Sequence, residues 1–384
     1  MRIGFDVSQT GAGRSGCGYF AESMIRHLAE IDDGNEYVLY PTFGSHWWDP
    51  DWQSGIATVA GPNFQRWEGH QSHQESRRFW DEPTEQFEAH LGDPDIVHAN
   101  NFFCPKGLHA ARLVYTLHDL AFLEYPEFAT EANRLACFDG VLRASLLADL
   151  IVAVSEHSRH HFLETFPHYP PERAIVMHEA SRFASRPIAR PEKLSMLAPG
   201  EFWLSVGTLE PRKNPVRLFR AYARLKSSAP LTWPLVWAGG NGWLMDDLPH
   251  LLKEEGLERD ILLLGRVDDE SLQWLYQNCF AFVFPSVFEG FGLPVLEALS
   301  LGAPVIAANT TSIPEVVGAA GLLVDPLSED EILAAMMKLD GDKALRQGLS
   351  SAGPRQAERF SWTQSARQLL QQYQRTCESA PFAN

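Results

Sequence analysis

Short apolar runs alternate with longer stretches of helical spacing along most of the chain, and the whole pattern occurs twice. In the first half, strands are expected at residues 2–7, 37–40, 95–99, 113–117 and 150–154. After residue 200 the alternation restarts, with strands expected at residues 202–206, 235–238, 261–264, 281–284, 305–308 and 322–324. Strands that alternate with helices form parallel sheets covered by helices. We therefore predict two α/β domains, each a doubly wound parallel sheet.

The boundary between the two domains is expected at residues 181–200, which contain three prolines and show no clear period. The first domain then covers residues 1–180 and the second covers residues 201–359. A last helix is expected at about 362–377, where Ser361 and Gln364 form a capping box, so residues 360–384 close the chain.

Composition excludes several classes of protein. The chain has 384 residues, of which 45% are hydrophobic and 21% charged, as in ordinary globular proteins. Its net charge of −17 argues against a nucleic-acid partner. No apolar run approaches the roughly 18 residues of a membrane span. Five scattered cysteines without CxxC spacing, and an N-terminus without a signal-peptide pattern, predict a cytoplasmic protein with reduced thiols.

The most informative segment is PSVFEGFGLPVLEAL, residues 285–299, directly after an expected strand. Ligands of open α/β sheets bind beyond the carboxyl ends of the strands. Gly290 and Gly292 flank Phe291 and let the backbone approach a ligand closely. Pro294 suits the first turn of the next helix, whose free N–H groups favour an anion. The segment therefore predicts an anion-binding loop.

Two carboxylates flank this loop, Glu289 before it and Glu297 eight positions later. Ionised carboxylates only accept hydrogen bonds, which suits the hydroxyl groups of a sugar or ribose. The alternative is a glycine loop with a surface glutamate at each end.

A second segment, GTLEPRKN at residues 207–214, follows the strand expected at 202–206. Arg212 and Lys213 are adjacent cations, and a guanidinium fork beside an ammonium group suits a diphosphate. The alternative is a solvated basic turn that pairs with Glu210.

The N-terminal loop contains Gly11, Gly13 and Gly16, which spell GxGxxG and raise the hypothesis of a nicotinamide cofactor. Three residues separate the expected strand from Gly11, and the second strand ends in Pro-Thr without an acid for a ribose. Both features argue against an NAD-dependent dehydrogenase, which stays an alternative.

His118 follows the strand expected at 113–117 and should point toward the ligand. It could bind a sugar hydroxyl or stabilise charge near a leaving group, or it could be a structural histidine with a backbone partner. His157, His160 and His161 have helical spacing but lack further ligands, so a solvated face is expected rather than a metal site.

Taken together, the motifs GTLEPRKN, EGFGLPVLE, TLHDLAFLEYPEF, VSEHSR and FSW resemble those of the retaining glycosyltransferases of family 4. The resemblance covers nearly the whole chain and is greatest to the branch that includes bacterial O-antigen mannosyltransferases. It implies the GT-B fold, with two Rossmann-like domains facing a cleft and a C-terminal helix that crosses back to the first domain. The acceptor would bind mainly to the first domain and the nucleotide-sugar to the second.

The resemblance also implies roles for individual residues of the second domain. Arg212 and Lys213 would neutralise the donor diphosphate, which would make a metal ion unnecessary. Glu297 would hold the donor ribose and Glu289 the hydroxyls of the transferred sugar. The other residues implied at the donor are Gly207, Val267, Gly290, Phe291, Gly292 and Leu293.

In the first domain, the resemblance places Gly16 near the donor phosphate and His118 beside the donor sugar. Catalysis would then rest on His118, Glu289, Arg212 and Lys213. The sequence SGCGYF stands where family members often have paired glycines, a departure that concerns Gly16.

The function expected from this resemblance is transfer of a hexose, with retention and without a metal or other cofactor, to a glycan or lipid-linked glycan. GDP-mannose is the first choice of donor and UDP-sugars the second. Alternatives are a nucleotide-sugar epimerase, a sugar phosphorylase, a sensor that binds the donor without turnover, and the dehydrogenase. Trp47, Trp48 and Trp52 either pack within an irregular loop, contact the acceptor, or make a peripheral contact with the inner face of the membrane.

Overall fold

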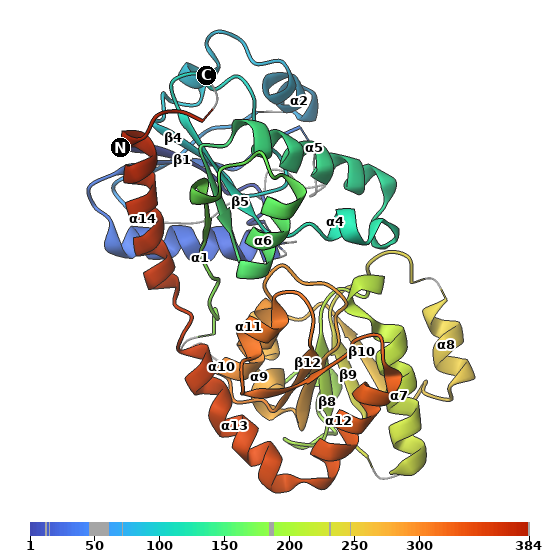
Figure 1. The fold of residues 1–384 in the computed structure, drawn as a ribbon. Helices are drawn as coiled ribbons and strands as arrows, with labels where there is room; N and C mark the ends of the chain where they lie inside the picture. Colours follow the sequence, from blue (N-terminus) through green and yellow to red (C-terminus); the bar gives the residue numbers. More distant parts are fainter. Residues whose placement is uncertain are drawn as a thin grey trace. The chain divides into compact units, whose positions relative to one another are not determined.

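The computed structural model describes residues 1–11, 14, 16–45, 61–70, 72–183, 188–229, 232–245 and 247–382. The chain forms two compact units (Figure 1). Unit 1 comprises Met1–Glu179 together with Ser361–Asn384, and unit 2 comprises Ala180–Phe360. Residues 181–183 and 188–200 of the expected linker belong to unit 2.

Unit 1 is built on a parallel sheet with the strand order β3-β2-β1-β4-β5-β6-β7. The strands are β1 (Arg2–Asp6), β2 (Glu36–Tyr40), β3 (Phe64–Arg66), β4 (Ile96–Ala99), β5 (Arg112–Leu117), β6 (Leu150–Ala153) and β7 (Ala174–Val176). The order reverses between β1 and β4, so the loops after these two strands meet at the switch point where such sheets bind ligands.

Helices cover this sheet: α1 (Gly16–Ile31), α2 (His73–Asp81), α3 (Phe87–His90), α4 (Ala121–Glu124), α5 (Glu131–Leu147), α6 (Glu156–Thr165) and α14 (Trp362–Glu378). The side chains of Ser155 and Ser361 accept backbone hydrogen bonds from Ser158 and Gln364, which confirms them as caps of α6 and α14.

The Trp-rich segment 42–92 contributes to the core of unit 1 where it is described. Trp80 is fully buried, and the centroid of its ring lies 4.4 Å from the ring centroid of Phe43 and 5.6 Å from that of Phe87. Trp67 donates a hydrogen bond from Nε1 to the carbonyl of His90, at 2.9 Å. Trp47, Trp48 and Trp52 lie outside the described residues.

The C-terminal helix α14 packs on α1 and belongs to unit 1, as predicted (Figure 1). Trp362 contacts Phe20 of α1, with ring centroids 5.7 Å apart. The hydroxyl of Tyr373 lies 2.5 Å from Nδ1 of His98 on β4, and Nε2 of His98 lies 2.7 Å from Oγ1 of Thr116 on β5. A buried polar chain thus joins α14 to the centre of the sheet.

Unit 2 repeats this architecture, with the parallel order β10-β9-β8-β11-β12-β13. The strands are β8 (Trp203–Val206), β9 (Leu235–Ala238), β10 (Ile261–Gly265), β11 (Ala281–Phe284), β12 (Val305–Ala308) and β13 (Gly321–Val324). The helices are α7 (Pro215–Ser228), α8 (Leu248–Glu254), α9 (Asp269–Asn278), α10 (Leu293–Ser300), α11 (Ile313–Val317), α12 (Glu329–Gly341) and α13 (Lys343–Ala357). The switch point lies between β8 and β11, beside the two segments that the sequence singled out. Two parallel-sheet Rossmann-like units therefore confirm the predicted fold class.

Candidate functional site

Two loops meet at the switch point of unit 2, residues 207–214 after β8 and residues 285–292 after β11. Asn214 adopts a left-handed conformation, with φ of 60°, and its Nδ2 donates to the carbonyls of Pro285 and Pro326 at 3.0 and 2.6 Å. The N–H of Val287 donates to the carbonyl of Arg212 at 2.8 Å. These bonds hold the two loops in a fixed register.

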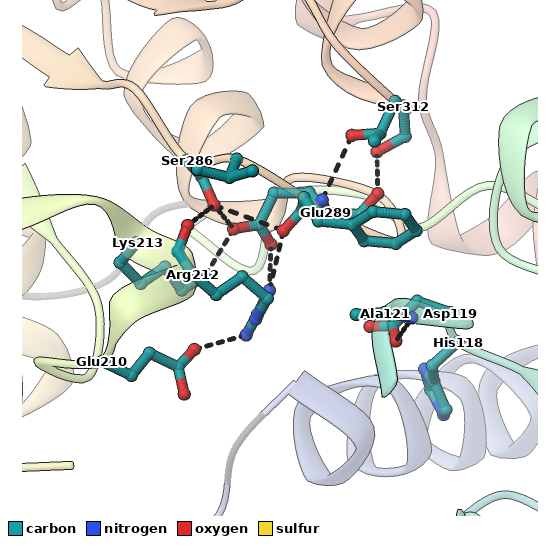
Figure 2. A network of polar contacts seen from close by, with 12 residues as sticks. His118, Asp119, Ala121, Glu210, Arg212, Lys213, Ser286, Glu289 and Ser312 are labelled. Carbon is teal, nitrogen blue, oxygen red and sulfur yellow. Dashed lines mark hydrogen bonds and ion pairs between the residues drawn. The ribbon is translucent and has the colours of Figure 1, made fainter. Parts of the chain in front are cut away.

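The charged side chains of the two loops form one network around Glu289 (Figure 2). Nζ of Lys213 lies 2.7 Å from Oε1 of Glu289, and Nη1 of Arg212 lies 3.1 Å from Oε2. Arg212 also pairs with Glu210 through Nη2, at 2.6 Å, and the Ser286 hydroxyl lies 2.5 Å from Oε1 of Glu289. The structure thus brings Arg212, Lys213 and Glu289 together, and it also contains the Glu210 pair that the alternative interpretation expected.

The charged groups of this network are largely buried, which affects the pKa values of Glu289 and Lys213. Glu289 is only 6% exposed. Burial alone would raise its pKa, but the charges of Lys213 and Arg212, with hydrogen bonds from Lys213 and Ser286, hold the pKa below its ordinary value. Burial lowers the pKa of Lys213, and Arg212 adds to this effect, whereas Glu289 opposes it. An ionised carboxylate and two cations are therefore held at one point.

Two glycines are required by the geometry of these loops. Gly207 has φ of 145°, and a Cβ there would lie 3.2 Å from Cε of Lys213. Gly292, which precedes the first turn of α10, has φ of 103°, and a Cβ would lie 2.5 Å from Cδ1 of Ile313. Gly290, Phe291 and Leu293 are buried beside them. Any larger side chain at Gly207 or Gly292 would strain the backbone and disturb its neighbours.

Glu297 lies on α10 in a second cluster. It is 2% exposed, its Oε1 forms an ion pair with Nε of Arg182 at 3.3 Å, and its Oε2 accepts a hydrogen bond from the Tyr276 hydroxyl at 3.2 Å. Sequence reasoning missed Arg182 and Tyr276, because no spacing rule relates residues on separate elements. Val267 follows β10 and is half-buried.

In unit 1, His118 follows β5, and its Nε2 lies 2.8 Å from the carbonyl of Asn100. Burial lowers its pKa, against the opposing effects of the Asn100 carbonyl and the Asp119 charge. A neutral imidazole that donates from Nε2 keeps Nδ1 as an acceptor. His118 therefore has the backbone partner of the structural interpretation and still presents a hydrogen-bond acceptor.

The glycine loop of unit 1 is described at Gly11, Arg14 and from Gly16 onward, whereas Gly13 lies outside the described residues. Gly16 begins α1 and is exposed, with open space where a Cβ would lie. Gly18, which sequence reasoning did not single out, is the glycine that packing requires, because a Cβ there would lie 2.0 Å from the carbonyl oxygen of Gln9.

Comparison with known proteins assigns this architecture to a family. Residues 14–180 match the model described as "Glycosyltransferase Family 4", and residues 192–356 match "Glycosyl transferases group 1". O-antigen chain mannosyltransferase B of Escherichia coli is 38% identical over 284 residues, which cover 72% of this chain and 74% of that protein. The chain belongs to glycosyltransferase family 4.

Solved structures confirm the GT-B fold of this family 4 glycosyltransferase. Sucrose-phosphate synthase of Thermosynechococcus elongatus superposes with a TM-score of 0.76 at 20% identity, covering 99% of this chain and 100% of that one. HepE of Anabaena, in complex with UDP and glucose, gives 0.71 at 20% identity, covering 97% and 99%. The comparisons do not favour the epimerase or the dehydrogenase.

Two features are absent from the described part of the glycosyltransferase. Within these residues no helix is both long and apolar enough to span a bilayer. No group of three or more His, Cys, Asp or Glu side chains in the described ranges is arranged to bind a metal ion.

Proposed function

We propose that this glycosyltransferase transfers a hexose, with retention, from a nucleotide-sugar to a glycan or lipid-linked glycan, and that it needs no metal or other cofactor. The observation that carries the proposal is the buried network of Arg212, Lys213 and Glu289. Mannose from GDP-mannose is the first choice, because a relative at 38% identity is named a mannosyltransferase. UDP-linked donors come second, because HepE was solved with UDP and glucose.

The two cations would stabilise the negative charge of the donor diphosphate. Breaking the bond between sugar and phosphate builds negative charge on the leaving diphosphate, and fixed donors stabilise this charge without reorganising. Arg212 offers a planar fork and Lys213 a point charge. Both pair with Glu289, which holds the two cations in place for the diphosphate.

Glu289 suits the transferred sugar, because it stays ionised and its lone pairs accept hydrogen bonds from hydroxyl groups. The backbone of Gly290, Phe291, Gly292 and Leu293 would lie along the sugar and phosphates. Glu297 would hold the ribose and Val267 would flank the base, while Gly207 makes room for Lys213.

The reaction that fits these groups is attack on the same face of the sugar. The acceptor oxygen forms a bond to the anomeric carbon as the bond from that carbon to the phosphate oxygen breaks. The proton of the acceptor hydroxyl passes to the departing phosphate oxygen, so charge and atoms balance. In unit 1, Gly16 would approach the phosphate, and His118 would accept a hydrogen bond at Nδ1 from a sugar hydroxyl. We place this reaction in the cytoplasm, peripherally at the inner face of the membrane.

The test measures transfer of labelled mannose from GDP-mannose to a lipid-linked oligomannoside, with and without a chelator. We expect Lys213→Ala and Glu289→Gln to lower turnover about 100-fold or more, the usual loss when one fixed charge-stabilising group is removed. Arg220→Ala is the matched control, because Arg220 is a partly exposed cation of α7 that pairs with Glu255 and Glu329. Circular dichroism of each variant reports the fold.

A thermal-shift panel identifies the donor. A ligand at 100 times its Kd stabilises the protein by about 2.7 kcal/mol, so GDP, GDP-mannose, UDP, UDP-glucose and NAD can be ranked directly. Near-normal transfer by either folded variant, loss of activity with chelator, or stabilisation by NAD alone would contradict the proposal.

A further inference from the structure

Arg182 is a charged side chain outside the network around Glu289, and it pairs with two carboxylates. It lies near the start of unit 2, and its side chain is only 8% exposed. Nε forms the ion pair with Glu297 at 3.3 Å, and Nη2 lies 3.5 Å from Oδ1 of Asp269. The guanidinium carbon lies 4.8 Å from the centre of the Phe183 ring. A buried guanidinium is thus shared between two carboxylates on α9 and α10.

The two carboxylates belong to different parts of the donor site. Glu297 is the residue assigned to the ribose, and Asp269 lies two positions after Val267, in the segment assigned to the base. Because one guanidinium pairs with both, Arg182 ties the base-flanking segment to the ribose-binding carboxylate. A lysine would offer a point charge there, whereas the planar fork of arginine can serve two acceptors at once.

The two carboxylate oxygens of Glu297 contact different groups. Oε1 forms the ion pair with Arg182, and Oε2 accepts the hydrogen bond from Tyr276. Burial, followed by the Glu297 charge, holds the pKa of Tyr276 well above its ordinary value, so the hydroxyl stays a donor. The cation and the hydroxyl together fix the orientation of the carboxylate.

We propose that Arg182 is a positioning residue for the nucleoside half of the donor, which it serves by holding the Glu297 carboxylate oriented toward the ribose hydroxyls. The inference rests on the proposed function, which assigns the ribose to Glu297. Without Arg182, a carboxylate that is 2% exposed would lose this counter-ion, a costly state that favours reorientation of the side chain.

The experiment compares two ligands that differ only in the ribose hydroxyls. Isothermal titration calorimetry measures the Kd of the preferred nucleoside diphosphate from the panel above, GDP or UDP, and of its 2′,3′-dideoxy analogue. The proteins are the wild type, Arg182→Gln, Arg182→Lys and Arg190→Gln. Arg190 is the matched control, since it lies in the same segment and its guanidinium covers the Trp274 ring at 5.4 Å.

We expect Arg182→Gln to weaken binding of the normal nucleotide tenfold or more and binding of the dideoxy analogue less than twofold. Arg182→Lys should lose less, because it retains the charge, and Arg190→Gln should bind both ligands as the wild type does. In a Glu297→Gln background, Arg182→Lys should cause no further loss, because both changes act through the same carboxylate.

The other outcomes overturn the inference. Equal weakening of both ligands would mean a purely structural role, and tighter binding by Arg182→Gln would mean that Arg182 blocks the ribose. If Arg182→Gln does not fold, Arg182→Lys decides between the same outcomes. If the wild type binds both ligands equally, Glu297 does not bind the ribose hydroxyls. If the wild type binds no nucleotide, the proposed function itself is contradicted.

Discussion

Lys213 and Glu289 are buried ions, and each stabilises the charged form of the other. Their approach could be predicted, because Arg212, Lys213 and Glu289 lie in loops that follow neighbouring strands of one sheet. The hydrogen bonds by which Asn214 and Ser286 join the two loops could not, because side-chain partners across loops depend on backbone geometry that the sequence does not express. The same limit hid Arg182.

Glycine at position 292 gives a residue-scale prediction. Gly292→Ala combines a left-handed φ of 103° with a Cβ 2.5 Å from Ile313, so we expect it to lower the free energy of unfolding of unit 2 by about 1–3 kcal/mol. Urea denaturation measures the loss. Gly240→Ala is the control, because a Cβ there meets nothing within 4 Å. Equal stability of the two variants would contradict the steric argument.

At the scale of elements, the central strands and the last helix, α14, were predicted, whereas β3 and β7 were missed. Both are three-residue strands at the edges of the sheet of unit 1. Their pairing depends on the neighbouring strand, and a run of three residues carries too little periodicity to reveal it. The attachment of α14 through His98 and Tyr373 was likewise invisible, because these residues are 275 positions apart.

His98 makes the stability of unit 1 depend on pH. Burial lowers its pKa from 6.5 to about 3, so between these values the unfolded chain binds a proton that the folded unit does not. Stability is therefore lost as pH falls from about 6.5 toward about 3, by roughly 5 kcal/mol in total.

Urea titrations at pH 7 and pH 4.5 test this pH dependence. We expect His98→Gln to be less stable at pH 7, because packing and hydrogen bonds change, but to lose less stability on acidification than the wild type. His160→Gln, at an exposed position that pairs with Glu164, should behave as the wild type. The same acid sensitivity in the wild type and His98→Gln would show that another group titrates.

At the scale of the molecule, two rounds of strand–helix alternation were enough to predict two α/β domains, whereas the return of the last helix to the first domain was implied by the resemblance to family 4. The arrangement of the chain also predicts how fragments behave. Unit 2 is one continuous segment, whereas unit 1 takes α14 from beyond unit 2. Leu369 and Tyr373 of α14 and Phe20 of α1 are fully buried, and burial of each such side chain contributes about 1.5–3 kcal/mol.

We therefore expect a fragment of residues 180–360 to melt cooperatively and to bind the nucleotide, while residues 1–179 alone do not melt cooperatively. Adding a peptide of residues 361–382 should restore cooperative melting to residues 1–179, and the same peptide with Tyr373→Ala should restore less. Circular dichroism follows the melts. A cooperative melt of residues 1–179 without the peptide would show that α14 is dispensable for that unit.

The position of α14 beyond unit 2 orders events during biosynthesis. A ribosome finishes every residue of unit 2 before it makes the helix that completes unit 1, so the sheet of unit 1 must wait, with the α1 surface uncovered, while the second unit emerges. Unit 2, to which the proposed function assigns the donor, can therefore mature first, and nascent chains that stall late in translation should already bind nucleotide while unit 1 still needs protection from aggregation.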